Sequence, residues 1–436
     1  DLYLEKINPA DPSEVMYRGQ WVKMTVIEER IPCRDCGGDP KSVLKICITP
    51  HGPIINDIEE GIGPQPVSIR RVEAEPWPIS EAFYKMSTAK NWSDFKNAVA
   101  LYAAGPQHIV YADTGGNIGY IGAGKCPVRR NSKGLLPQPG WDGAHEWAGY
   151  YPFTAMPSSF NPASGFIVTA NNSPVRGKFP IPLSEYWEPP YRAERINALI
   201  KAGTTHTVAG MKAMQLDVKS ELAARVVPGI VAMLRKTVTG EYKKYLDALA
   251  AWDFHAAPGS APACIYEVLL NRIIHRTFAD ELGKDLLERL MKDKIAVTNI
   301  IADLLLRRQH SPFFDDVTTN KVETCGDVAA AAFRETVDFL KGRLGPDMGK
   351  WQWGAIHEIE FSHLFGAEPM LRPLFNYGTF PFGGDDHTIN RGGFDKTKPY
   401  KVSITASIRY IVDFSNLEDS LVVLSSGQSA HLLSGH

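Results

Sequence analysis

The sequence predicts an α+β fold, because strand patterns occupy both ends of the 436-residue chain and helical patterns occupy its middle. Up to about residue 130, short apolar runs alternate with clusters of turn-forming residues. From residue 193 onward, apolar side chains recur at the spacing of amphipathic helices. After Trp351 the alternating pattern returns. We therefore divide the chain into a strand-rich first part with site loops, a helical excursion and a return to the sheet: 1–192, 193–345 and 346–436.

In the first part, the sequence predicts strands at 24–31, 43–49, 109–112 and 118–121. Two short helices are expected between them, at 80–86 and 93–102. Ser93 is the predicted cap of the second helix, since serine commonly caps helix N-termini. Residues 131–192 are rich in Gly, Pro and Trp, which indicates loops that cross one end of a sheet.

The clearest helical pattern is at 263–282, where Ile265, Leu269 and Ile273 step by four residues. Leu270, Ile274 and Phe278 form a second row beside them. Further helices are predicted at 212–236, 242–252, 286–306 and 328–344. In the last part, the alternation over 403–414 and the apolar run at 421–424 predict a half-buried hairpin.

Composition excludes some classes of partner. Lys and Arg together number 47 against 49 Asp and Glu, so no basic field favours nucleic acid or an anionic membrane. No apolar run approaches the roughly 18 residues that span a bilayer. We expect neither nucleic acid nor membrane as a partner. Because the chain opens at Asp1 inside a strand-like run, we expect a processed or truncated product.

Of the six cysteines, Cys33 and Cys36 have close spacing, on a predicted turn between two strands. A zinc site would need a second such pair, and a redox motif would open a helix. We interpret the pair as structural, either two thiols or a local disulfide at a hairpin tip.

The stretch from Gly165 to Gly177 has two interpretations. An apolar run at 166–168 predicts a buried strand that ends at Asn171 and Asn172, followed by Pro174. An amide held rigidly at a strand end could serve as a catalytic hydrogen-bond donor. Asn, Ser and Pro also shape ordinary turns, so a purely structural turn is the alternative.

Taken with its flanks, this stretch resembles the penicillin acylase family of N-terminal-nucleophile amidohydrolases, whose large chain carries a similar Asn-Asn-x-Pro. Any single match is weak, but ten further segments follow the family's order over some four hundred residues. These are 19–21 (GQW), 50–53 (PHGP), 89–92 (AKNW), 111–120 (YAD and GNIGY), 137–141 (PQPGW), 146–149 (EWAG), 191–196 (YRAERI), 251–253 (AWD), 353–357 (WGAIH) and 427–429 (GQS).

The resemblance implies a four-layer αββα sandwich with a helical excursion. It also implies hydrolysis of a linear acyl amide, of the penicillin or acyl-homoserine-lactone type, through an acyl-serine. In such enzymes the nucleophile is the first residue of the large chain, and its own α-amino group is the base. The similarity places that residue before Asp1. The chain is therefore expected to be a truncated large (beta) chain without the nucleophile, whose partners are the small-molecule acyl amide, a small (alpha) chain and the start of the beta chain. A periplasmic or secreted location is also implied.

Four site residues follow from the resemblance. Asn171 would donate its side-chain N–H to the oxyanion, and Arg192 would orient Asn171 and the terminal amine. For Arg192 the alternative is an exposed ion pair. Phe83 and Gln107 match walls of the acyl pocket, although Phe83 could equally be a core residue. A Gln in that wall departs from the phenylacetyl-specific pattern.

No cofactor is required for the chemistry, but the family also has a structural calcium, for which Asp1 matches one ligand. The set is incomplete, because Ile181 stands where another acid is expected and only Glu185 is near, whereas calcium takes six or more oxygens. His51, His357 and His387 lack metal-binding spacing and are interpreted as structural. The competing hypothesis for the whole chain is a non-catalytic member that serves as a binding or structural domain.

Overall fold

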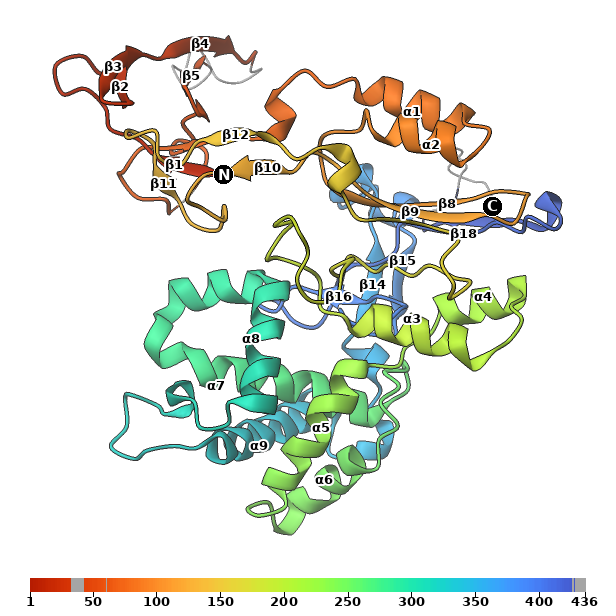
Figure 1. Cartoon of the computed structure of the whole chain (residues 1–436). Helices are drawn as coiled ribbons and strands as arrows, with labels where there is room; N and C mark the ends of the chain where they lie inside the picture. Colours follow the sequence, from red (N-terminus) through yellow and green to blue (C-terminus); the bar gives the residue numbers. More distant parts are fainter. Residues whose placement is uncertain (33–42, 60, 426, 428–436) are drawn as a thin grey trace. The chain divides into compact units, whose positions relative to one another are not determined.

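The computed structural model describes residues 1–32, 43–59, 61–425 and 427, and combines helices with strands as predicted (Figure 1). It separates into two compact units. The first unit is Asp1–Ile167 with Ser173–Glu185, and the second unit is Val168–Asn172 with Tyr186–His436. The predicted boundaries at 192/193 and 345/346 separate strand-rich from helical sequence and are not drawn from contacts between residues. They stay a prediction. The Cys33/Cys36 pair and the motif residues Gln428 and Ser429 lie outside the described residues.

The first unit is built from short strands. Among its described residues they form three sheets of three strands, ordered β11-β1-β7, β13-β9-β8 and β4-β5-β6, and two pairs, β2-β3 and β10-β12. Their bounds are β1 Leu2–Leu4, β2 Glu14–Tyr17, β3 Gln20–Lys23, β4 Thr25–Arg30, β5 Val43–Thr49, β6 Gly52–Pro53, β7 Val67–Ile69, β8 Gln107–Ala112, β9 Ile118–Ala123, β10 Pro127–Arg129, β11 Gln138–Pro139, β12 Trp147–Tyr150 and β13 Ser158–Phe160. All four strands predicted in this part are confirmed.

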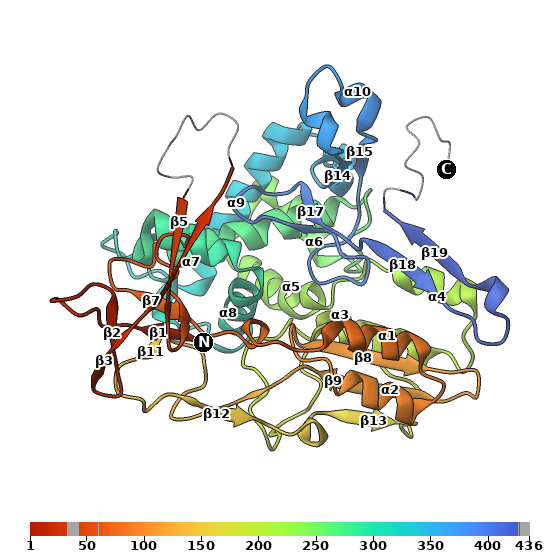
Figure 2. The same cartoon turned by 90° about the horizontal axis from the view of Figure 1, so that it is seen from above.

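Two helices, α1 (Ile79–Thr88) and α2 (Trp92–Val99), lie against the β8–β9 hairpin (Figure 2). A Cβ atom on Gly119 of β9 would come within 2.2 Å of the Trp92 ring, so only glycine lets this ring pack on the strand. Both predicted helices are present. The predicted cap is wrong, because the side chain of Asn91, two residues before Ser93, accepts the hydrogen bond from the Asp94 N–H at 2.9 Å.

The second unit contains the helical excursion. Its helices are α3 Tyr191–Ala202, α4 Val208–Gln215, α5 Glu221–Leu234, α6 Lys243–Ala250, α7 Ala261–Lys292, α8 Lys294–Arg307, α9 Cys325–Leu344 and α10 Arg372–Phe375. Helices α5 to α9 gather around one core (green to teal in Figure 1), into which α7 buries Ile265, Leu269 and Ile273 as predicted. Across the described parts of the chain, no helix has the length and apolarity that a membrane crossing requires.

Two predicted helices are in fact interrupted. The helix expected at 212–236 breaks between α4 and α5, where the Ser220 side chain caps α5 by accepting from the Ala223 N–H. The helix expected at 286–306 breaks at Asp293, which caps α8. Within α7, Gly283 has a positive φ of 64° and ends the helical geometry that the sequence pattern placed up to residue 282.

Within its described residues, the last part of the chain contributes three further strand pairs: β14 (Glu358–Phe361) with β15 (Gly378–Pro381), β16 (Gly393–Phe394) with β17 (Val402–Ile404), and β18 (Ile408–Ile411) with β19 (Leu421–Leu424). The β18–β19 hairpin confirms the predicted pairing with 421–424. The strand expected over 403–414 is interrupted at 405–407, and the residues before this break belong to β17, which pairs with β16. The prediction that it is half buried is wrong, since Tyr410 and Val422 are 60% and 59% exposed. A two-stranded hairpin leaves both of its faces exposed unless another element packs on them. An alternation of apolar and polar residues therefore does not by itself ensure that the apolar face is buried.

Candidate functional site

Asn171 lies in a loop of the second unit and not at the end of a strand. The run at 166–168 forms no strand, so that prediction is wrong, although its residues are half buried. Asn171 has a φ of 64°, in the left-handed region that Asn tolerates better than most residues. Its carbonyl accepts a hydrogen bond from the Glu188 N–H at 3.2 Å. Its backbone is therefore held by a contact with residue 188 and not by a sheet.

The side chain of Arg192 fixes the orientation of the Asn171 amide. Arg192 Nη2 donates to the Ala170 carbonyl at 2.8 Å and to Asn171 Oδ1 at 3.3 Å. A guanidinium can only donate, so the atom facing it must be the amide oxygen. The NH₂ group of the Asn171 side chain therefore points away from Arg192. Asn171 is exposed.

Helix α3 positions this arginine in its first turn. The helix begins at Tyr191, directly after Pro189 and Pro190, and the buried Tyr191 ring packs edge-on against His387 at 5.7 Å. The Arg192 side chain is only 13% exposed, so the alternative of an exposed ion pair does not describe it. Burial lowers the pKa of its guanidinium, and the neighbouring Glu188 carboxylate opposes that shift.

Asn172 makes the contact expected of a turn. Its Oδ1 accepts the Ala170 N–H at 3.1 Å, and the next residue, Ser173, donates from Oγ to the Val175 carbonyl at 3.0 Å. The structural-turn interpretation therefore applies to Asn172. Of the five predicted site residues, Asn171 and Arg192 are the pair in direct contact.

Phe83 and Gln107 both lie in the first unit. Phe83, on α1, is 58% exposed and touches Tyr102 edge-on with 5.7 Å between ring centroids, so the core alternative does not hold. Gln107 is the first residue of β8, pairs with Ala123 and is exposed. Their role as pocket walls stays a prediction.

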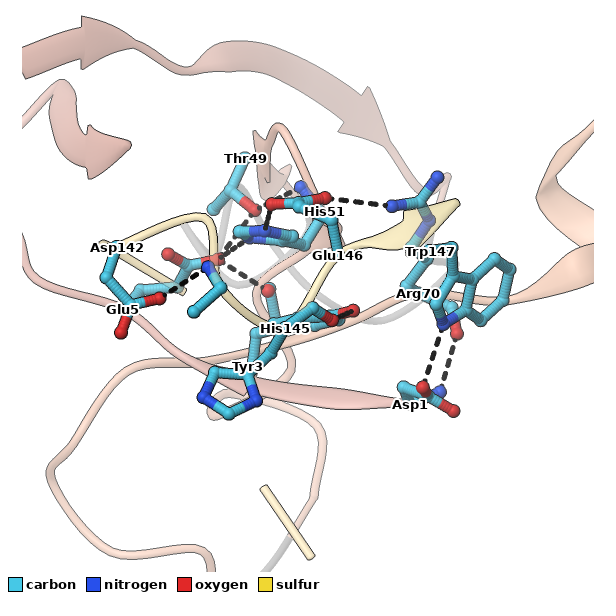
Figure 3. Close-up of polar contacts among 12 residues, drawn as sticks. Asp1, Tyr3, Glu5, Thr49, His51, Arg70, Asp142, His145, Glu146 and Trp147 are labelled. Carbon is cyan, nitrogen blue, oxygen red and sulfur yellow. Dashed lines mark hydrogen bonds and ion pairs between the residues drawn. The ribbon is translucent and has the colours of Figure 1, made fainter. Parts of the chain in front are cut away.

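The Asp1 carboxylate is held by protein donors, of which Figure 3 shows Trp147. Arg129 binds both of its oxygens at 2.8 to 3.0 Å, and Trp147 Nε1 donates to Oδ2 at 2.8 Å. A guanidinium beside this carboxylate supplies the positive charge that a cation would bring. At the position where another acid is expected, Ile181 is buried, and the nearby Glu185 pairs with Lys133.

These residues do not fit a calcium site. Calcium takes six or more oxygen ligands, whereas the Asp1 oxygens are already engaged by nitrogen donors. Among the residues that the structure describes, no group of three or more His, Cys, Asp or Glu side chains is arranged to hold a metal ion.

His51 is the centre of a buried charge network in the first unit (Figure 3). Its Nδ1 lies 2.9 Å from Glu5 Oε1 and its Nε2 lies 3.0 Å from Glu146 Oε1. Arg70 binds the second Glu146 oxygen at 3.2 Å. We call these four residues the His51 network. Burial alone lowers the pKa of His51, but its hydrogen bonds to both carboxylates outweigh burial and raise that pKa above its usual value.

The two other histidines that the sequence analysis singled out, His357 and His387, are also buried. His357 Nδ1 lies 2.8 Å from the Tyr400 carbonyl, and burial lowers the pKa of His357 to about 4. His387 lies 3.2 Å from Thr298 Oγ1 and is buried. These positions agree with the structural interpretation of all three histidines.

Sequence reasoning missed Glu188, Arg391 and Asp386. The Glu188 carboxylate lies 3.7 Å from Arg192 and 3.4 Å from Arg391, which in turn lies 3.7 Å from Asp386. The spacing of four residues between Glu188 and Arg192 is a signal that could have revealed the first pair. Arg391 lies about two hundred residues further along the chain, and no local pattern connects it to Arg192.

Comparison with known proteins gives several matches. The penicillin amidase family model matches residues 1–436. An acyl-homoserine lactone acylase, QuiP, of Pseudomonas aeruginosa is 30% identical over 429 residues, covering 89% of this chain and 50% of the relative. The penicillin acylase 2 proenzyme of Pseudomonas sp. strain SE83 is 28% identical over 450 residues, covering 100% and 55%. The chain thus spans about half the length of these relatives.

A solved structure, the thermostable penicillin G acylase from Alcaligenes faecalis in orthorhombic form, matches 80% of this chain and 66% of its own chain, with a TM-score of 0.64 and 21% identity. That likeness concerns the fold alone, and it agrees with the predicted mixed fold of helices and strands. The family match along the entire sequence confirms the resemblance drawn from its motifs. The chain belongs to the penicillin amidase family.

Proposed function

We propose that the complete protein hydrolyses linear acyl amides, and that this chain contributes one oxyanion donor, Asn171, with Arg192 as its orienting partner. The main observation in support of this proposal is the 3.3 Å hydrogen bond from Arg192 Nη2 to Asn171 Oδ1. Because this contact engages the amide oxygen, the NH₂ group of Asn171 is directed to the opposite side. A fixed donor of this kind stabilises the negative charge that develops when a nucleophile attacks a carbonyl.

The covalent step belongs to residues that the resemblance places before Asp1. There, an N-terminal serine would attack the amide carbonyl while its own α-amino group takes the proton, since such an amine titrates near pH 8. The C–N bond breaks as the amine leaves with a proton, and water then releases the acid from the acyl-serine. The chain would work with a small alpha chain and the start of the beta chain, in the periplasm or outside the cell.

The first substrates to test are N-acyl-homoserine lactones, because several relatives are named as acylases of these amides. Phenylacetyl amides, including penicillin G, form the second set. In both sets, a neutral acyl group is joined through one secondary amide to a polar amine. Each substrate therefore presents one amide carbonyl, whose oxygen Asn171 would stabilise as the oxyanion.

The test uses the product of the complete gene, incubated with acyl-homoserine lactones of graded chain length and with phenylacetyl amides. We expect release of the free amine and, on rapid quenching, a mass increase equal to one acyl group on the chain that carries the nucleophile. If the processed protein releases no amine from either set, the proposal fails. If the upstream sequence has no Ser, Thr or Cys at the processing point, the competing binding or structural role is favoured.

A further inference from the structure

Glu188 contacts both Asn171, the proposed oxyanion donor, and Arg192, which orients that donor. Its backbone N–H donates to the Asn171 carbonyl at 3.2 Å, and its carboxylate oxygen Oε2 lies 3.7 Å from Arg192 Nη2. One residue therefore holds the backbone of the donor and the side chain that orients the donor. Glu188 precedes α3, which begins at Tyr191.

Burial distinguishes this pair from the more exposed ion pairs that share its four-residue spacing. The side chains of Glu188 and Arg192 are both 13% exposed. Other pairs at the same four-residue spacing are about half exposed, and such pairs contribute little (Lys85 with Glu81, Lys243 with Asp247, Lys292 with Glu288). In a partly desolvated position, a missing counter-charge costs much more than it does at the surface.

The second oxygen of Glu188 faces another arginine. Arg391 Nη2 lies 3.4 Å from Glu188 Oε1, so the carboxylate stands between two guanidinium groups with one oxygen toward each. Arg391 also lies 3.7 Å from Asp386 Oδ1, and Lys294 reaches the same oxygen at 3.7 Å. Without the Glu188 charge, Arg192 and Arg391 would repel each other across the gap.

The segment that carries Arg391 is itself fixed. Asp386 and Thr388 are buried, and the Gly392 N–H donates to the Asp385 carbonyl at 3.0 Å. The Asn390 N–H donates to the Asp217 carbonyl at 2.9 Å, while the Asp217 carboxylate binds Arg195 of α3 at 2.7 and 3.0 Å. Arg391 therefore acts as a rigid outer counter-charge.

We infer that Glu188 is a positioning residue, which holds Arg192 against Asn171 Oδ1 and is held in turn by Arg391. This inference rests on the proposed function of Asn171. Glu188 touches no reacting atom, and its contribution passes entirely through the Asn171 amide. Neutralising Glu188 should therefore weaken oxyanion stabilisation and leave substrate binding nearly unchanged.

The test is a double-mutant cycle in the complete gene product, with kcat, KM and melting temperature measured on each variant. We expect Glu188→Gln to lower kcat about tenfold with KM within about twofold. In an Asn171→Ala background the same change should alter kcat by less than about twofold, since the group through which Glu188 acts has been removed. Glu188→Asp, which keeps the charge, should recover part of the loss.

The matched control is Glu194→Gln, which removes a carboxylate from α3 that pairs with Arg225. It should leave kcat within about twofold in both backgrounds. If Glu188→Gln fails to fold, Arg391→Gln tests the same contacts, because Arg391 holds Glu188 on the side away from Arg192. We expect a smaller loss of kcat, about threefold, and no such loss in the Asn171→Ala background.

The possible outcomes distinguish the positioning role of Glu188 from the donor role of Asn171. An unchanged kcat in Glu188→Gln, or an equal loss with and without Asn171, would overturn the positioning role while the proposed function stands. An unchanged kcat in Asn171→Ala alone would instead exclude Asn171 as the oxyanion donor, and the positioning role of Glu188 with it, while the proposed amide hydrolysis itself would stand.

Discussion

Two charge networks of similar composition differ in how closely their charged groups approach one another. In the His51 network of the first unit, the charged side chains meet at 2.9 to 3.2 Å. In the second unit, Glu188 meets Arg192 and Arg391 at 3.7 and 3.4 Å, and this group, which we call the Arg192 network, ends at the exposed Asn171. The first network is closed, whereas the second leads to a polar group at the surface.

The surroundings of each network extend this contrast. His51 stacks on the Tyr3 ring at 4.0 Å, and Glu5 also accepts from Thr49 and Ser68 at 2.9 and 2.6 Å. Asn171, in contrast, has a left-handed backbone, a conformation that proteins tend to retain at functional positions. The comparison indicates that a network of short, buried ion pairs stabilises the fold, while a network with one directed, exposed end serves binding or chemistry.

The largest expected effect is on stability and comes from breaking the closed network. His51→Gln removes the positive charge between two buried carboxylates, and a neutral amide cannot serve both. We expect the free energy of unfolding to fall by about 3–5 kcal/mol, because a buried charge loses its partner. Denaturant titration with circular dichroism measures this fall.

A matched surface change tests whether burial is the cause. Lys45→Gln breaks an ion pair with Glu28 whose side chains are more than half exposed, and it should cost less than about 1 kcal/mol. If His51→Gln costs no more than Lys45→Gln, the His51 network is not the stabilising element described above.

The next effect is on catalysis and comes from removing the directed end of the second network. Asn171→Ala in the complete protein should lower kcat by about 10²–10³, some 2.7–4 kcal/mol, with KM nearly unchanged. The donor acts where charge develops, so its loss appears in the transition state and hardly in substrate binding. Steady-state kinetics on acyl-homoserine lactones measures both constants.

Asn172→Ala is the control for this prediction, because Asn172 makes the local turn contact with Ala170. It should cost about 1 kcal/mol of folding stability and leave kcat within about threefold. The reverse pattern, a normal kcat in Asn171→Ala with a lowered melting temperature, would exclude Asn171 from the mechanism.

Local patterns predicted most elements of both units. The four early strands and the buried face of α7 follow from alternation and from the spacing of Ile265, Leu269 and Ile273, since these depend on neighbours in the sequence. Errors arose where side chains end an element. Ser220 and Asp293 cap new helices inside patterns that otherwise look continuous.

The candidate site could be predicted only in part. The motif identified Asn171 and Arg192, and the structure brings them together without the strand that the sequence pattern placed before Asn171. Glu188 lies close to Arg192 in sequence, but Arg391 reaches it only through the fold of the segment at 385–392. Contacts between distant segments depend on packing, which no local pattern records.

A smaller effect is expected at Gln107, which belongs to neither network. If this exposed residue lines the acyl pocket, Gln107→Ile should raise kcat/KM for phenylacetyl amides about 10-fold, near 1.4 kcal/mol, by removing a poorly paired amide. Rates on a series of aromatic and aliphatic acyl groups measure it. Equal rates across the series for the two proteins would place Gln107 outside the pocket.

The smallest and most gradual effect is expected from pH alone. In the second network Arg192 keeps its charge throughout the neutral range, because a guanidinium does not lose its proton there. In the first network the pKa of folded His51 is raised above the usual 6.5. The stability that its charge contributes is therefore fully present below about pH 6.5 and is lost as the pH rises through the raised value.

The difference in melting temperature between the parent protein and His51→Gln isolates this contribution, because other titrating groups are shared. Between pH 6 and pH 9 we expect the difference to be largest at the acidic end and to shrink steadily. In Glu188→Gln the corresponding difference should stay constant over the same range, since its partner Arg192 keeps its charge there. A His51 difference that grows with pH would mean that the imidazole is neutral in the folded protein, and the closed network would then be held by hydrogen bonds and not by charge.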